Sequence, residues 1–304
     1  AASKSGHKGV VELLLEKGAD VNAQGGFSGT ALRAACAGAH KDIVQLLLEN
    51  GADVNSRGSE YGRALHTVSA RGDRDLVKLL LENGADANAQ GGYGNALWVA
   101  SRGGHTEVVR MLVEGGADIN AHNGSYGTAL QVASYEGHKE VVQLLLDKGA
   151  DASDPGGHYY GSALLAAASR GNLEILELLL ESGVDVNSRG GGHNNTALQV
   201  ASARGDLKVV QLLLEKGADV NARGGAYGNA LHAACNCGRK EVVQLLLESG
   251  ADIHAEGGHF GNALQAASSW GDKSIVLMLI ERGADVNAQG GHYGNALQAA
   301  AHRG

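Results

Sequence analysis

A short phrase, Gly-(Ala/Val)-Asp, recurs along the whole chain, and its period restricts the fold more than any other feature. Its glycines stand 32 to 34 residues apart, at Gly18, Gly51, Gly84, Gly116, Gly149, Gly183, Gly217, Gly250 and Gly283. Ala-Leu pairs recur in step, beginning at Ala31, Ala64, Ala96, Ala129, Ala163, Ala197, Ala230, Ala263 and Ala296. A fixed period of this length indicates a solenoid, in which each repeat is one small unit stacked on its neighbours.

The unit of residues 225–257 shows the local structure that we expect in each repeat. Asn229 precedes an Ala-Leu pair and can accept an unpaired backbone N–H as an N-cap, so a first helix is expected over residues 230–236. A second helix is expected over residues 240–249. Gly250 then ends it, because glycine readily adopts the left-handed conformation found after helices.

The second helix has a wide apolar face, formed by Val242, Val243, Leu245, Leu246 and Leu247. One helix pair cannot bury such a face alone, whereas stacked copies cover one another. The sequence therefore predicts an all-α solenoid of about nine helix–turn–helix repeats. We expect one array over residues 1–304, with partial repeats at 1–24 and 290–304.

The opening of the first helix resembles that of the ankyrin repeat, which reads Thr-Pro-Leu-His-x-Ala with a period of about 33 residues. Residues 229–234 read Asn-Ala-Leu-His-Ala-Ala, and alanine replaces the proline in every unit. The loop variant Gly-Gly-x-(Tyr/Phe)-Gly is similar to arrays of fungal NACHT-type and related multidomain proteins. The resemblance implies short β-turn loops, a concave protein-binding groove, and a sensor or specificity role within a larger intracellular protein.

One aromatic residue stands before a glycine in most loops: Tyr61, Tyr93, Tyr126, Tyr160, Tyr227, Phe260 and Tyr293. Two interpretations stay open. Each ring can pack against the next loop and stiffen the row. Alternatively, the exposed ring faces form a binding rail, because tyrosine offers rigid, amphipathic contact area.

The least regular positions lie at the ends of the first helices, where the resemblance implies the floor of the groove. The candidates there are Arg71, Arg102, Tyr135, Arg170, Arg204 and Trp270. The chain has two tryptophans, Trp98 and Trp270. Because tryptophan is frequent among the residues that dominate binding energy, both are candidate anchors, with partial burial as the alternative for Trp98.

The formal net charge of −8 argues against nucleic-acid binding by the chain as a whole. Arginines nevertheless gather at loop and helix-end positions: Arg57, Arg63, Arg71, Arg102, Arg170, Arg189, Arg204, Arg223 and Arg303. Against Glu60, Glu136, Asp154 and Glu256 they leave +5 in these regions and −13 elsewhere. We expect this charge to attract an acidic partner. The alternative is that the arginines pair with neighbouring carboxylates.

The thirteen histidines raise the question of a metal site. His7, His40, His105 and His138 occupy one equivalent position after a first helix, where the resemblance implies a ring bonded to backbone. The loop histidines are His158, His193, His259 and His292. Steps of roughly 10 Å between repeats are too long for shared zinc ligation near 2 Å, so we expect no metal.

Other classes of protein are also disfavoured. No apolar run approaches the length of a membrane-spanning helix. Three cysteines (Cys36, Cys235 and Cys237) are too few for a disulfide scaffold, so we expect a reduced, intracellular and cytoplasmic setting. No catalytic set stands apart from the repeat, so we expect neither enzyme activity nor a cofactor.

The function that we predict is protein recognition through a groove built from loop tips and first-helix ends. Two alternatives stay open. The array can be a structural spacer or a self-associating surface, and its oligomeric state is not predicted. It can also bind a small molecule or an anionic polymer along the arginines, which steep salt dependence would reveal.

Overall fold

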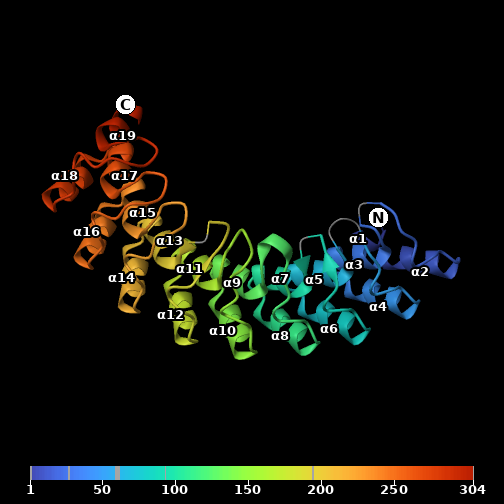
Figure 1. The fold of residues 1–304 in the computed structure, drawn as a ribbon. Coiled ribbons are helices and arrows are strands. Elements are labelled where there is room, and N and C mark those ends of the chain that lie inside the picture. The colour runs from blue at the N-terminus through green and yellow to red at the C-terminus, as the bar shows by residue number, and fades with distance from the viewer. Residues whose placement is uncertain (1, 27, 59–61, 93, 194, 304) are drawn as a thin grey trace. The chain divides into compact units, whose positions relative to one another are not determined.

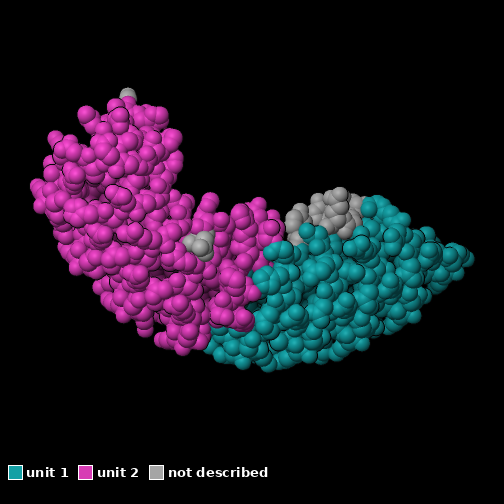
Figure 2. All heavy atoms as spheres, in the orientation of Figure 1, with its two compact units in different colours: residues 1–124, 128–150 teal, residues 125–127, 151–304 magenta. Residues whose placement is uncertain are grey.

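The computed structural model describes residues 2–26, 28–58, 62–92, 94–193 and 195–303. In these residues the chain forms α-helices α1 to α19, one 3₁₀-helix, η1 (Gly124–Tyr126), and two short β-hairpins. It divides into two compact units, shown in Figure 2. Unit 1 is residues 1–124 and 128–150, and unit 2 is residues 125–127 and 151–304. The single array expected over residues 1–304 stays a prediction.

Unit 1 is built from helix pairs (Figure 1). Its first helices are α1 (Ala2–Ser5), α3 (Ala31–Gly38), α5 (Ala64–Arg71), α7 (Ala96–Arg102) and α9 (Ala129–Glu136). Its second helices are α2 (Lys8–Glu16), α4 (Lys41–Glu49), α6 (Arg74–Glu82), α8 (Thr106–Glu114) and α10 (Lys139–Asp147). Each first helix contacts the next first helix, and each second helix the next second helix, so the pairs stack in two layers.

Unit 2 repeats this arrangement. Its first helices are α11 (Ala163–Arg170), α13 (Ala197–Arg204), α15 (Ala230–Asn236), α17 (Ala263–Trp270) and α19 (Ala296–Arg303). Its second helices are α12 (Leu173–Glu181), α14 (Leu207–Glu215), α16 (Lys240–Glu248) and α18 (Lys273–Glu281). The expected all-α solenoid of helix–turn–helix repeats is therefore confirmed.

The loops between repeats close as narrow antiparallel turns. In unit 1, β1 (Gln90–Gly91) pairs with β2 (Gly94–Asn95), and in unit 2, β3 (Arg189–Gly190) pairs with β4 (Asn195–Thr196). Single bridges between glycines close five further loops, as at Gly224 and Gly228. These turns hold the loop tips at the start of the first helices that follow them.

The predicted N-caps are present. The side chains of Thr30, Asn95, Thr128, Ser162, Thr196, Asn229, Asn262 and Asn295 each accept the backbone N–H of the third helical residue. Arg63 takes this position in α5 and has no such acceptor. In α5 the bond runs in the opposite direction: the backbone N–H of Arg63 donates to Nδ1 of His66, the third helical residue, at 3.3 Å.

The third residue of a first helix also ties its repeat to the next loop. Gln199 accepts the Thr196 amide through Oε1 at 2.9 Å and donates through Nε2 to the carbonyls of Ala222 and Gly224, both at 3.1 Å. The His66 ring also links its repeat to the next loop, through a single bond: its Nε2 lies 2.9 Å from the Ala89 carbonyl. These buried polar side chains satisfy the backbone groups that stacking removes from water.

The core lies between the two helix layers. Val242, Val243 and Leu246 of α16 are at most 1% exposed, which confirms the centre of the predicted apolar face, while Leu245 and Leu247 are half-buried at its margins. Cys36 and Cys235 are also fully buried, and burial raises the pKa of the Cys36 thiol to about 12. Both cysteines therefore act as small packing residues.

A second set of cross-repeat bonds follows the second helices. Asn22 donates through Nδ2 to the Gly51 carbonyl at 3.0 Å, and its Oδ1 accepts the Asp53 amide at 2.7 Å. Equivalent pairs of bonds start from Asn55, Asn88, Asn187 and Asn221.

Among the described residues, no helix is long and apolar enough to cross a membrane.

Candidate functional site

The residues at the C-terminal ends of four successive first helices in unit 2, three of them last helical residues and one a C-cap, form a row that we call the helix-end row. Its members stand seven residues after the alanine of each Ala-Leu pair: Arg170, Arg204, Cys237 and Trp270. Because α11, α13, α15 and α17 contact one another in order, the four residues follow each other along one edge of the layer. Cys237 is half-buried and the other three are exposed. The core of unit 2 therefore does not use these side chains.

Trp270 is held at one side and open at the other. Its side chain is 49% exposed, an unusual fraction for tryptophan. Gly238 has a φ of +65°, and a Cβ placed on it would overlap Nε1 of the Trp270 ring. The indole thus lies across a glycine of the preceding repeat, which fixes its position while leaving area for a partner.

Arg204 adds positive charge to the helix-end row, two repeats before Trp270. Its side chain is exposed, while Asp206, two residues further on, accepts the Val209 amide at 3.2 Å as the N-cap of α14. Arg239, at the position equivalent to Asp206, donates through Nε to the Ala203 carbonyl at 3.0 Å. The row therefore combines cationic groups with an aromatic ring.

In unit 1 the equivalent arginines bind groups of the neighbouring repeats. Arg102 Nε lies 3.7 Å from Glu136 Oε1, and Arg71 donates through Nη1 to the Ala37 carbonyl at 3.1 Å. Tyr135, in the same region, is half-buried. The predicted helix-end arginines Arg71, Arg102, Arg170 and Arg204 are therefore exposed in both units, and those of unit 1 also bind neighbouring repeats.

Loop arginines also bind backbone. Arg63 donates through Nη1 to the Gln90 carbonyl at 2.7 Å and through Nε to the Asn55 carbonyl at 2.9 Å. Arg189 donates to the Arg223 carbonyl. These two arginines therefore join neighbouring loops through backbone carbonyls, a role that neither interpretation named.

Trp98 was predicted as a candidate anchor for a partner, and the structure corrects this, because the side chain is buried. Its side chain is 3% exposed, and the Arg102 guanidinium carbon lies 5.7 Å from the centre of its ring. The physical reason is position. Trp98 is the third residue of α7, which points toward the next repeat as Gln199 does in α13, so it cannot offer a ring face to a partner.

The aromatic loop residues contact one another, as one of the two open interpretations expects. Phe260 and Tyr293 are half-buried, with ring centroids 6.1 Å apart. Tyr227 is half-buried, and burial together with a hydrogen bond to Cys237 raises its pKa. Tyr126 is 43% exposed, so ring area also stays open at some tips. Tyr61 and Tyr93 lie outside the described residues.

One exposed aromatic residue was missed by the sequence reasoning. Tyr159 is 66% exposed and stacks on Tyr126, with ring centroids 4.9 Å apart and planes 8° apart, while the half-buried Tyr160 lies 6.5 Å from Tyr126. The sequence does contain a sign of this second tyrosine: the interval from Gly149 to Gly183 is 34 residues, because the loop has one extra residue. The insertion adds a second tyrosine to the tip.

The histidines behave in two ways. His40, His105 and His138 each place Nε2 within 3.2 Å of a carbonyl of the preceding repeat, as expected. The expected spacing of about 10 Å between loop histidines is wrong, since His259 and His292 stack with ring centroids 4.7 Å apart. Among the described residues, no three His, Cys, Asp or Glu side chains gather as a metal site requires.

Comparisons with known proteins agree with this architecture. A family model described as ankyrin repeats (3 copies) matches residues 1–91, 65–156, 153–224 and 224–290. The crystal structure of the human ASB11 ankyrin repeat domain is similar, with a TM-score of 0.63 and 29% sequence identity. The similarity covers 72% of this chain and 96% of that one. No curated protein sequence matches the chain significantly.

Proposed function

This chain belongs to the ankyrin-repeat family, and from that premise we propose that it recognises a partner protein through the helix-end row of unit 2. Ankyrin repeats are in general protein–protein interaction modules. The fold is typically non-enzymatic. The proposal therefore concerns which surface of this chain binds, and what chemistry that surface selects.

The observation that carries the proposal is the exposure of Arg170, Arg204 and Trp270 at the ends of helices whose other residues are buried or half-buried. Binding there requires little reordering, because α11, α13, α15 and α17 are already packed side by side. A preorganised surface loses less conformational entropy on binding than a flexible one.

The chemistry of the row favours an acidic partner with an apolar or aromatic residue. Two guanidinium groups can each bind a carboxylate through paired N–H donors. Trp270 offers a partly held indole, the type of side chain that dominates interface energies. The aromatic loop tips, including Tyr160, Tyr227, Phe260 and Tyr293, extend this contact area as a second proposed part of the surface. We propose this recognition as the sensor or specificity function of a larger intracellular protein.

The test is capture of partners from a lysate by the intact chain, followed by mass spectrometry and affinity measurement on the protein recovered. Trp270→Ala and Arg204→Glu should each weaken binding about 30-fold, as substitutions at dominant interface residues do. Leu277→Ala and Lys208→Glu are matched controls, because both residues are exposed on second helices. Equal retention of the partner by all four variants would reject the helix-end row as the binding surface.

A further inference from the structure

Two tyrosines at one loop tip of unit 2 form a parallel stack. Tyr126 and Tyr159 lie with ring centroids 4.9 Å apart and planes 8° apart. Both belong to unit 2, and they stand one repeat apart in the sequence. Parallel, offset aromatic rings at this separation are in van der Waals contact. The stack therefore places ring carbons of two phenols next to each other.

The backbone supports this contact. The Tyr159 amide donates to the carbonyl of Ser125, the residue before Tyr126, at 3.1 Å. A Cβ placed on Gly157 would overlap the Ser125 oxygen and the Gly127 nitrogen, so two segments of backbone meet there with no room for a side chain. The chain on both sides of Tyr126 is thus held close to the segment that carries Tyr159.

The stacked pair is also open to solvent, which the other aromatic pairs of the loops do not match. Tyr126 is 43% exposed and Tyr159 is 66% exposed, so a reagent in solution can reach both rings. Tyr160 is half-buried, and its ring lies 6.5 Å from Tyr126 with the planes 47° apart. Tyr293 has the ring of Phe260 beside it, which carries no hydroxyl. Parallel contact and access are combined at Tyr126 and Tyr159.

We propose that Tyr126 and Tyr159 are a modification site, at which one-electron oxidation joins the two rings as dityrosine. Each phenol gives up one electron and its hydroxyl proton and becomes a phenoxyl radical. The two radicals form a carbon–carbon bond between positions ortho to the oxygens. The hydrogens on these carbons then move to the oxygens, which restores both phenols. Hydrogen peroxide, used by a haem peroxidase, takes up the two electrons and two protons and becomes two molecules of water.

The cross-link fixes one arrangement of this loop tip. Stacked rings can separate and stack again, whereas a carbon–carbon bond between them holds the stacked arrangement permanently. Oxidation at this site therefore leaves a lasting change in one exposed loop surface of unit 2.

The test treats the full chain, at low concentration, with a haem peroxidase and hydrogen peroxide. The monomeric product should show the fluorescence of dityrosine, and its mass should be lower by two hydrogen atoms. Proteolysis followed by mass spectrometry should recover one pair of linked peptides, joined at Tyr126 and Tyr159. Absence of dityrosine, or links formed only between separate chains, overturns the proposal.

Conservative variants identify the two residues that react. Tyr126→Phe and Tyr159→Phe each keep the ring but remove the hydroxyl from which the radical forms, so either should abolish the link within the chain. Tyr160→Phe is the matched control, because it changes the neighbouring tyrosine of the same loop and should leave the yield unchanged. Loss of the link in Tyr160→Phe, or its survival in Tyr159→Phe, would show that a different pair reacts.

A glycine variant tests the role of the backbone contact. Gly157→Ala keeps every tyrosine but places a Cβ against the Ser125 oxygen, so the two segments must move apart and the yield of dityrosine should fall. Circular dichroism checks that the variant keeps its helices. An unchanged yield in the folded variant would contradict the proposal that this close approach brings the rings into reaction.

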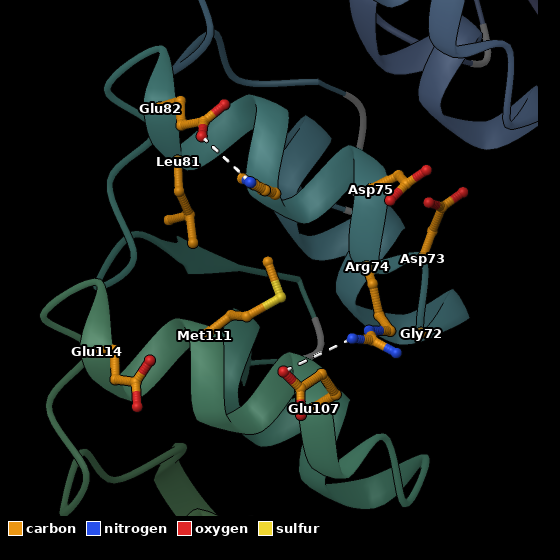
Figure 3. A pocket seen from close by; sticks show the side chains of 10 residues that line it. Gly72, Asp73, Arg74, Asp75, Leu81, Glu82, Glu107, Met111 and Glu114 are labelled. Carbon is orange, nitrogen blue, oxygen red and sulfur yellow. Dashed lines mark ion pairs between the residues drawn. The ribbon is translucent and has the colours of Figure 1, made fainter.

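Hydrogen peroxide without the peroxidase is the chemical control. Peroxide alone transfers oxygen to thioethers and gives methionine sulfoxide. Met111 of α8 lies half-buried beside Leu81 of α6 (Figure 3) and reports that reaction by mass spectrometry. Met111 should therefore gain oxygen while no dityrosine forms. Dityrosine formed equally well with peroxide alone would overturn the one-electron step.

Discussion

The two tryptophans of the chain occupy two different rows of the first helices, and the contrast separates folding from recognition. Trp98 is the third residue of α7 and is 3% exposed, whereas Trp270 is the last residue of α17 and is 49% exposed. In several other repeats the third position holds a residue that bridges to the next loop, such as His66, Gln199 and Gln265. The last position holds exposed residues of different types, such as Arg71, Arg204 and Trp270. The place of a residue within the repeat, more than its type, determines its role.

The largest expected effect removes the buried tryptophan. Trp98→Ala should lower the free energy of unfolding by about 3–5 kcal/mol, because it leaves a large cavity between repeats. Trp270→Ala should change it by less than about 1 kcal/mol, since half of the side chain is already in water. Denaturant unfolding followed by far-UV circular dichroism measures both. Similar losses of unfolding free energy in the two variants would contradict the distinction between the third and the last helical position.

The next effect concerns pH and the third position of α5. Burial first, then the charge of Arg63, lower the pKa of His66 to about 4, although bonds from neighbouring backbone groups oppose them. Above the ordinary histidine pKa of about 6.5 the folded and unfolded chains both hold a neutral ring. Below it the ring is protonated in the unfolded chain but stays neutral in the folded chain until the pH approaches the lowered pKa. Stability is therefore lost as the pH falls from about 6.5 to 4, by about 3 kcal/mol in total.

Glutamine at this position should remove that dependence. Gln199 and Gln265 already make the equivalent bonds without a titrating group. Burial also lowers the pKa of His232 in α15, so the double variant His66→Gln, His232→Gln is the informative one. Its unfolding free energy should vary less between pH 7 and pH 4 than that of the parent chain. An unchanged slope would show that these rings titrate alike in both states.

The smallest effect sharpens the description of Trp270. Gly238→Ala places a Cβ against the indole and strains a left-handed backbone, so we expect a loss of about 1–2 kcal/mol and a shift in Trp270 fluorescence. Gly250→Ala is the matched control, because it has a φ of +88° and no atom within 4 Å of the added Cβ. The control should lose stability through strain alone and leave the fluorescence unchanged. If both variants leave it unchanged, Trp270 does not rest on Gly238.

Local signals made the helices predictable. The first helix expected over residues 230–236 is observed as α15, and the second ends at Glu248, one residue before the predicted end, because Ser249 takes the cap position. Caps and glycines act within a few residues, so they can be recognised in a sequence without knowledge of the packing.

The candidate site was less predictable because it depends on contacts between repeats. The burial of Trp98 follows from the direction of its helix position, which residue type alone does not reveal. The stacking of His259 on His292 arises because adjacent loop tips approach more closely than the step between helices suggests. Tyr159 was missed because an inserted residue breaks the register by which the loops were aligned.

The asparagine bonds between second-helix exits have a mechanical consequence. Under tension along the stack, each such bond pair shares the load between consecutive repeats, as Asn221 does with Gly250 and Asp252. Ser153 and His254 stand at the equivalent sites in unit 2, and the described residues show no such link from either. A pulling experiment on the chain should therefore find weak joints at the two exits without this link, after Ser153 and after His254, while the linked repeats still bear force.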